Sequence, residues 1–236
     1  MFDRRCQVIV VTSCNFRQWQ ARGEKEWLPS FLRTGIPLKV YHEGFPVQPA
    51  PQAGVEWIDL FQADPGILKI VSDPRFNQAR SCRTRNQRYY NYHAQFWLRK
   101  VAAMNHACKA HPNEIVVWTD IDVKPRRFFR QEVIGRMCNA YDVWRIDRHA
   151  MRQKVTDTGF LVFSPAAHSV VKEWYRMYSS GDVFELPFWA DHFCLDHVVE
   201  KMKPKVGALP LPLKGHGSLV YHSLGHVEMA GLRKPV

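Results

Sequence analysis

The sequence predicts an α/β fold with a mostly parallel central sheet flanked by helices, in a single domain. Three observations support this prediction. The β-branched run at 8–11 ends in polar residues that suit a loop, strand and helix patterns alternate after it, and a second apolar run at 115–118 has the length of a buried strand. The 236 residues are 46% hydrophobic, which is enough to bury one sizeable core.

The first half of the chain predicts a regular alternation. Residues 24–34 suit a helix that stops at Gly35, and residues 37–41 and 55–60 suit two further strands separated by a loop rich in proline. Apolar residues spaced four and three apart from Tyr90 to Cys108 predict a long amphipathic helix over 85–110. The buried strand at 115–118 follows it.

The second half predicts strands at 142–146 and 159–163 and a helix at 166–180, which begins after Pro165 and closes at Gly181. A further helix at 190–202 precedes a tail rich in Gly, Pro and His. No repeat or low-complexity segment separates the halves, so residues 1–236 are expected to form one domain.

The chain is strongly basic. It has 33 Lys and Arg against 22 Asp and Glu, a net charge of +11 and a pI near 9.5. Residues 74–113 contain no acidic residue and eight of the basic ones. This excess predicts a polyanionic partner.

Composition also excludes several classes. The six cysteines lie far apart without a CxxC pair, which argues against a zinc module or a disulfide scaffold and favours a reducing compartment. No apolar run approaches the roughly 20 residues of a membrane span, and the N-terminus does not look like a cleaved leader. We expect a soluble protein in the cytoplasm of a bacterium or of a virus- or phage-infected host cell.

The sharpest chemical signal is Asp120-Ile121-Asp122, which follows the buried strand at 115–118 directly. Two carboxylates two residues apart at the carboxyl end of such a strand project to one side, where ligands bind in open α/β sheets. Their mutual repulsion is relieved by a hard divalent cation, so we expect Mn²⁺ or Mg²⁺ there. Such an ion could bridge a diphosphate.

Five segments in this order resemble the GT-A fold nucleotide-sugar glycosyltransferases, above all small viral and bacterial members. They are the aromatic segment 89–103 with its Lys100-Val101 ending, the DxD motif, Thr156–Phe163, the run 178–191, and 222–225 followed by 231–234. The resemblance extends from about residue 7 to about residue 234. Asp157 stands where Glu is usual, and Ala190 where His is usual.

This resemblance implies a GT-A-like, Rossmann-like sheet, with the nucleotide sugar bound by residues 1–123 and the acceptor by residues 124–236. It implies metal-dependent, inverting transfer of a sugar, most typically from a UDP-sugar, to an acceptor hydroxyl. Thr12 and Ser13 would meet the nucleoside, Asp59 the base or ribose, and Lys100 the diphosphate. Asp120 would approach the ribose and the metal, and Asp122 would ligate the metal.

Two roles remain open between residues. The family tail offers a His as a further metal ligand, but the spacing differs here, so His216, His222, His226 and Glu228 are all candidates; His222 and His226 are preferred. An inverting transfer needs a carboxylate base. Asp191 is the first candidate, although it also suits a helix N-cap, and Asp157 is the second.

The basic segment suggests the acceptor. Arginines alternate with aromatic residues there, a combination that neutralises phosphates and stacks on bases. Enzymes of the base J glucosyltransferase type are a precedent, so a hydroxymethylated base in DNA is one candidate acceptor; a glycan, lipid-linked or protein acceptor is the alternative. The predicted nucleic-acid contacts are Arg83, Arg85, Arg88, Arg99, Arg126 and Arg127.

Two other classes compete. A phosphatase of the haloacid-dehalogenase type also uses DxD after a buried strand, but at the first strand of the chain and with Thr or Val where this chain has Lys124. A non-catalytic nucleic-acid-binding protein would need the DxD only for solubility. Nucleoside diphosphate release from a nucleotide sugar separates the transferase from both.

Overall fold

A seven-stranded sheet forms the centre of the protein, in the order β10-β8-β9-β6-β1-β2-β3. The computed structural model describes residues 7–46, 52–77, 79–83, 89–126, 129–147, 156–209 and 220–222. Four neighbouring pairs of strands are parallel, and only β9 runs antiparallel to both of its neighbours, β6 and β8. The predicted α/β class with a mostly parallel sheet is therefore confirmed.

The first strand is longer than the apolar run predicts. β1 spans Val8–Cys14, and a helical segment follows at once as α1 (Phe16–Gln18), a π-helical stretch (Trp19–Trp27) and α2 (Leu28–Leu32). The helix predicted at 24–34 therefore begins eight residues earlier, at Phe16. The reason is local: Asn15 accepts from the Gln18 backbone, and the Gln18 side chain accepts from the Asn15 backbone, which makes a capping box.

The elements up to the DxD motif include one correction. β2 (Leu38–His42) and β3 (Val55–Asp59) match prediction, and α3 (Leu60–Ala63), α4 (Gly66–Val71) and a 3-10 turn (Pro74–Asn77) follow. The helix predicted over 85–110 starts only at Ala94, as α5 (Ala94–Ala110), because Tyr89–His93 is a strand, β5, paired with β4 (Ala79–Arg83). Three tyrosines in five residues favour a strand, although Tyr90 continues the helical spacing.

The remaining elements agree with the predicted ones and add several. β6 (Ile115–Thr119) leads into the DxD motif, and β8 (Val143–Asp147), β9 (Thr156–Phe163), α7 (His168–Ser179) and α8 (Asp191–Met202) lie near their predicted places. The additions are β7 (Val123–Pro125), α6 (Gln131–Ala140), β10 (Val206–Leu209), β11 (Val220–His222) and two 3-10 turns, Pro165–Ala167 and Asp182–Glu185.

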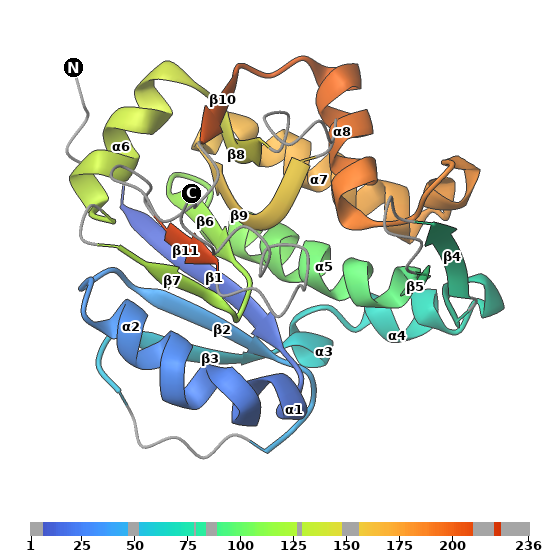
Figure 1. The fold of residues 1–236 in the computed structure, drawn as a ribbon, viewed down its shortest axis with the longest axis horizontal. Coiled ribbons are helices and arrows are strands. Elements are labelled where there is room, and N and C mark those ends of the chain that lie inside the picture. Colours follow the sequence, from blue (N-terminus) through green and yellow to red (C-terminus); the bar gives the residue numbers. More distant parts are fainter. Residues whose placement is uncertain are drawn as a thin grey trace, which may run out of the picture.

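Both faces of the sheet are covered, as Figure 1 shows. Ile9 and Val11 of β1 pack with α5, α7 and α8, whereas Val8 and Val10 pack with the residue 19–31 helical segment and with α6. Alternate side chains of one strand thus enter two cores, which explains why the first four residues of β1 and of β6 are all apolar. Within the described residues, no helix is both long and apolar enough to cross a membrane.

The strand order also locates a binding site. From β1 the chain moves to β2 and β3 on one side, and it returns to β6 on the other side of β1. In open α/β sheets, ligands bind outside the carboxyl ends of strands where the order reverses in this way. That position here is the crevice after Cys14 of β1 and after Thr119 of β6.

Candidate functional site

A cavity of about 640 Å³ occupies this crevice. Its walls come from the end of β1, the helical segment after it, the loop after β2, the first turns of α5 and the end of β6. The lining residues are Ser13, Asn15, Arg17, Gln18, Ala21, Arg22, Glu43, Phe96, Trp97, Lys100, Trp118, Asp120, Ile121 and Asp122. We call this cavity the cleft.

Each carboxylate of the DxD motif faces a cation in the cleft. Asp120 Oδ1 accepts from Lys100 Nζ at 3.0 Å and from Trp118 Nε1 at 2.8 Å. Asp122 Oδ2 lies 3.3 Å from Arg22 Nη1. The repulsion between the two carboxylates is therefore offset by side chains of the protein itself.

Lys100 joins Asp120 to a second carboxylate that lies far away in sequence. Its Nζ is 2.9 Å from Asp191 Oδ2 and donates to the Thr158 carbonyl at 2.7 Å. Burial alone would lower the pKa of Lys100, but the charges of Asp120 and Asp191 outweigh it and raise that pKa. Lys100 is thus a buried, permanently charged lysine at the inner end of the cleft, although the sequence places it at the edge of an apolar stripe.

Asp191 is fully engaged in this cluster. Besides Lys100, its Oδ2 accepts from the Thr158 hydroxyl at 2.6 Å, and its Oδ1 accepts from the His192 backbone at 2.8 Å. Burial would raise the pKa of Asp191, but Lys100 and these hydrogen bonds hold it well below its usual range. A carboxylate with a depressed pKa is a weak base, and the role of Asp191 as the general base stays a prediction.

Asp157, the second candidate base, does not line the cleft. It is 4% exposed, and its Oδ1 accepts from the Gly159 backbone at 2.9 Å. Since Thr158 is directed toward Lys100 and Asp191, its neighbour Asp157 lies on the opposite face of β9.

The predicted nucleoside contacts are only partly brought together. Ser13 lines the cleft, but Thr12 is fully buried beside it and does not. Asp59 lies outside the cleft and caps α3, where its Oδ1 accepts from Phe61 N at 2.9 Å and Gln62 N at 3.2 Å. A helix cap explains this carboxylate without a ligand.

Only two of the six predicted nucleic-acid contacts, Arg99 and Arg126, have side chains that the structure describes. Arg99 is paired inside the protein, since its Nη1 donates to Glu43 Oε2 at 2.7 Å and its guanidinium lies 5.8 Å from the Phe61 and Phe96 rings. Arg126 lies beyond β7 in a separate cavity. Of the others, Arg83 is placed only as a backbone position on β4, and Arg85, Arg88 and Arg127 lie outside the described residues.

The chemistry of the site suits a hard divalent cation. Asp120 and Asp122 supply carboxylate oxygens, the ligands that Mn²⁺ and Mg²⁺ prefer, although no cluster of three potential ligands occurs within the described part of the chain. β11 pairs antiparallel with β7 so that His222 is opposite Val123, the residue after the motif. This backbone register brings His222 beside the motif, and His226 lies outside the described residues.

Sequence reasoning missed Arg22, Trp118 and Thr158. Arg22 lies in the π-helical stretch, where a heptad or 3.6-residue pattern does not predict the direction of a side chain. Trp118 looks like a residue of the buried strand, and Thr158 becomes relevant only through its contact with Asp191. Of these three residues, only Trp118 could have been recognised from the sequence, because the N–H of a buried Trp needs a hydrogen-bond acceptor.

No protein-family model and no curated protein sequence matches this chain. Several solved structures are similar. A glycosyltransferase involved in the glycosylation of the major capsid of PBCV-1 has a TM-score of 0.53 at 9% identity, covering 96% of this chain and 98% of that one. The galactosyltransferase LgtC, solved with donor and acceptor sugar analogues, has a TM-score of 0.52 at 9% identity, covering 92% and 87%.

At such low identity these similarities concern the fold. They extend over nearly the whole chain, and they agree with the strand order and with the position of the cleft. The chain therefore has the GT-A fold of the nucleotide-sugar glycosyltransferases.

Proposed function

We propose that this protein is a glycosyltransferase that moves a sugar from a nucleoside-diphosphate sugar to an acceptor hydroxyl. The observation that carries the proposal is the DxD motif at the carboxyl end of β6, inside a 640 Å³ cleft at the switch point of a GT-A fold. Such a cleft has the size of a small-molecule site. A uridine diphosphate sugar is the donor that we expect.

The cations of the cleft suit a diphosphate. Arg17 and Arg22 line it, and guanidinium groups bind phosphate oxygens. Lys100 adds its positive charge from the inner end of the cleft, but its three N–H donors are taken by Asp120, Asp191 and the Thr158 carbonyl. Ser13 and Asn15 lie at the end of β1, where the nucleoside would enter. Asp120 and Asp122 would hold Mn²⁺ or Mg²⁺, with His222 or His226 as a further ligand; when bound, that ion supplies positive charge to the departing diphosphate.

We propose that Asp191 fixes Lys100 in the cleft. Its two oxygens are occupied by Lys100, Thr158 and His192 N, so it has little capacity left to accept a proton from an acceptor. An inverting transfer would require that capacity from Asp191 or Asp157. The anomeric configuration of the product therefore tests the predicted inversion directly.

The DxD context argues against the phosphatase. The motif follows β6 in the middle of the sheet, whereas the phosphatase nucleophile ends the first strand of its chain. Lys100 and Trp118 also both donate to Asp120 Oδ1, the carboxylate that would have to attack. Two donors on that oxygen weaken it as a nucleophile.

For the acceptor we propose a hydroxymethylated base of DNA, supported by the net charge of +11. A base within a duplex must leave the stack to reach an enzyme pocket. Phe96 lines the cleft and is 51% exposed, so its ring could stack on the displaced base.

The test is a panel of nucleotide sugars with and without Mn²⁺, read by thermal shift and by release of nucleoside diphosphate. A ligand present at a hundred times its dissociation constant stabilises the folded protein by about 2.7 kcal/mol. We expect stabilisation of this size from the sugars of one nucleotide class. Transfer is then measured on DNA containing hydroxymethyluracil or hydroxymethylcytosine, and on glycan acceptors. Inorganic phosphate release, or no response to any donor, would contradict the proposal.

A further inference from the structure

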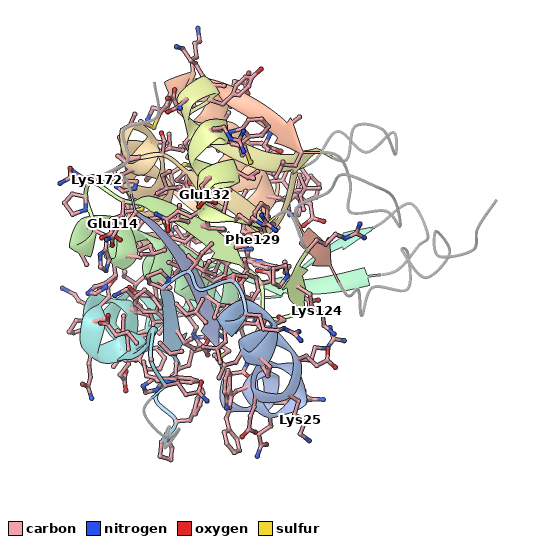
Figure 2. The ribbon with its side chains drawn as sticks, turned by 90° about the vertical axis from the view of Figure 1, so that its left-hand side faces the viewer. Lys25, Glu114, Lys124, Phe129, Glu132 and Lys172 are labelled. Carbon is pink, nitrogen blue, oxygen red and sulfur yellow. The ribbon has the colours of Figure 1, made fainter. Side chains whose placement is uncertain are left out.

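A second cavity, of about 650 Å³, lies between the end of α2 and the start of α6. Three arginines line it, Arg33, Arg126 and Arg130, so we call it the arginine cavity. Figure 2 looks onto this side of the molecule, with Phe129 and Glu132 near the centre and Lys124 and Lys25 below them. Nothing in the proposed transfer reaction uses this cavity.

The lining carries an excess of positive charge. Arg33 and Arg130 are exposed, and neither makes an ion pair with any residue that the structure describes. Among the described lining residues, Glu132 is the one carboxylate, against three guanidinium groups. Guanidinium forks match phosphate oxygens in geometry and in charge, so a phosphate group is the ligand chemistry that this cavity fits.

The backbone adds to that preference. α6 begins at Gln131, and its N-cap residue, Arg130, makes no capping hydrogen bond with its side chain. The first N–H groups of a helix lack intrahelical partners, and the helix dipole places positive charge there. The arginines and the helix start thus present donors to the same hollow.

The position of the cavity relative to the cleft suggests which phosphate compound binds. β7 connects them, since Asp122 lies just before it and Arg126 just after it. The three residues of β7 span about 10 Å at roughly 3.3 Å each, which is about three steps of 3.4 Å along the axis of a DNA duplex. Lys124, between the two, pairs with Glu26 at 2.8 Å and keeps a half-exposed side chain.

We propose that the arginine cavity binds the phosphodiester backbone of DNA and so holds a nucleotide about three steps away at the cleft. The purpose of this contact rests on the proposed transfer to a DNA base, but the binding itself does not. On this proposal the arginine cavity, and not Arg99, is the anchor for the acceptor, that is, the place where the DNA backbone is held.

The test is the salt dependence of DNA binding, measured by fluorescence anisotropy with single-stranded and duplex oligonucleotides between about 50 and 200 mM KCl. Each phosphate contact contributes about 0.9 to the log–log slope in a duplex and about 0.7 in a single strand. The variant Arg33→Gln/Arg126→Gln/Arg130→Gln should therefore flatten the slope by about 2 to 3 units. The double variant Arg33→Gln/Arg130→Gln, which changes only exposed residues, should flatten it by about 1.5 to 2 units.

The matched control is Lys69→Gln/Lys172→Gln/Lys205→Gln, which removes the same formal charge from exposed positions outside both cavities. Figure 2 shows Lys172 to the left, away from Phe129 and Glu132. We expect this variant to keep a slope within about 0.5 of the wild-type value. An equal loss in the control would show diffuse binding and overturn the proposal.

Two further results would also overturn it: no DNA binding by the wild-type protein at about 50 mM salt, or binding of pyrophosphate in the cavity without binding of DNA. Donor binding is measured in the same variants by thermal shift. Unchanged donor binding with weakened DNA binding supports the anchor. A wild-type protein that binds DNA through these arginines but no nucleotide sugar would refute the proposed transferase and leave the anchor standing.

Discussion

Lys100→Met tests the buried cluster at the inner end of the cleft. Methionine has a similar length and fits a buried site, but it removes the charge that Asp120 and Asp191 share. Asp191 is 2% exposed, so it would remain as a buried carboxylate beside Thr158, His192 N and the His192 ring, whose Nδ1 is 3.5 Å from Asp191 Oδ1. Removing one partner of a buried pair typically costs about 3–5 kcal/mol. For a chain of this size that loss lowers Tm by about 6–20 °C.

The effect should depend on pH in a defined direction. In the wild-type protein the pKa of Asp191 is depressed, so its contribution to stability is present above the unfolded pKa near 3.9 and is lost as the pH falls through the folded pKa. Without Lys100 the folded pKa should instead rise above 3.9, because burial then dominates. The deficit of Lys100→Met should therefore be largest near pH 7 and shrink toward pH 4.

The deficit is measured as the free energy of unfolding in urea at pH 7 and pH 4. Four proteins are compared: wild type, Lys100→Met, Asp191→Asn and the double variant. We expect the double variant to recover more than half of the deficit at pH 7, since the uncompensated charge is gone. A deficit below about 1 kcal/mol at pH 7, or one that does not change with pH and is not recovered, would refute the account of Lys100 and Asp191 as a coupled pair.

The other predictions concern the reaction. Asp122→Ala should abolish Mn²⁺-dependent transfer while changing stability by no more than about 1 kcal/mol, because its pair with Arg22 is partly exposed; normal turnover with Mn²⁺ would contradict the metal assignment. If Asp191 is a positioning residue, Asp191→Asn should weaken donor binding and leave the acidic limb of the pH–rate profile in place. Loss of that limb at unchanged donor affinity, with a rate loss of about 10² to 10⁴, would instead establish Asp191 as the base. Arg22→Gln should weaken binding of a nucleoside diphosphate in EDTA by about fivefold, near 1 kcal/mol, as measured by calorimetry, with Lys25→Gln as the control; equal affinities would remove Arg22 from the diphosphate site.

The sequence predicts the central strands β1, β6 and β9 because they are buried on both faces. An apolar run such as 115–118 has few alternatives, and the polar residues after it mark the functional end of the strand. The β4–β5 hairpin was missed because Tyr90 fits the period of the following helix while its neighbours favour a strand. A spacing rule cannot choose between two patterns that share a residue.

The site was less predictable because its partners come from distant segments. Lys100 and Asp191 are 91 positions apart, and only the packing of α5 and α8 against β9 brings them to 2.9 Å. The same packing sends Arg99 to Glu43, although Arg99 and Lys100 look alike in a basic segment. Neighbouring helix positions differ by about 100° in direction, so one of two adjacent cations enters the cluster and the other pairs elsewhere.

The two cations that face the DxD motif differ in what they can do. The Lys100 side chain is 7% exposed and is held by two carboxylates and a carbonyl, so displacing it would leave Asp191 buried and uncompensated. The Arg22 side chain is 36% exposed and faces Asp122 at 3.3 Å, a pair of the kind that contributes little to stability. We therefore expect a divalent ion to displace Arg22 from Asp122, and a diphosphate to draw Arg22 away from Asp122, while Lys100 stays in place. On the proposed metal assignment, Asp122 is the carboxylate that must exchange its partner, whereas Asp120 is already oriented by Lys100 and Trp118.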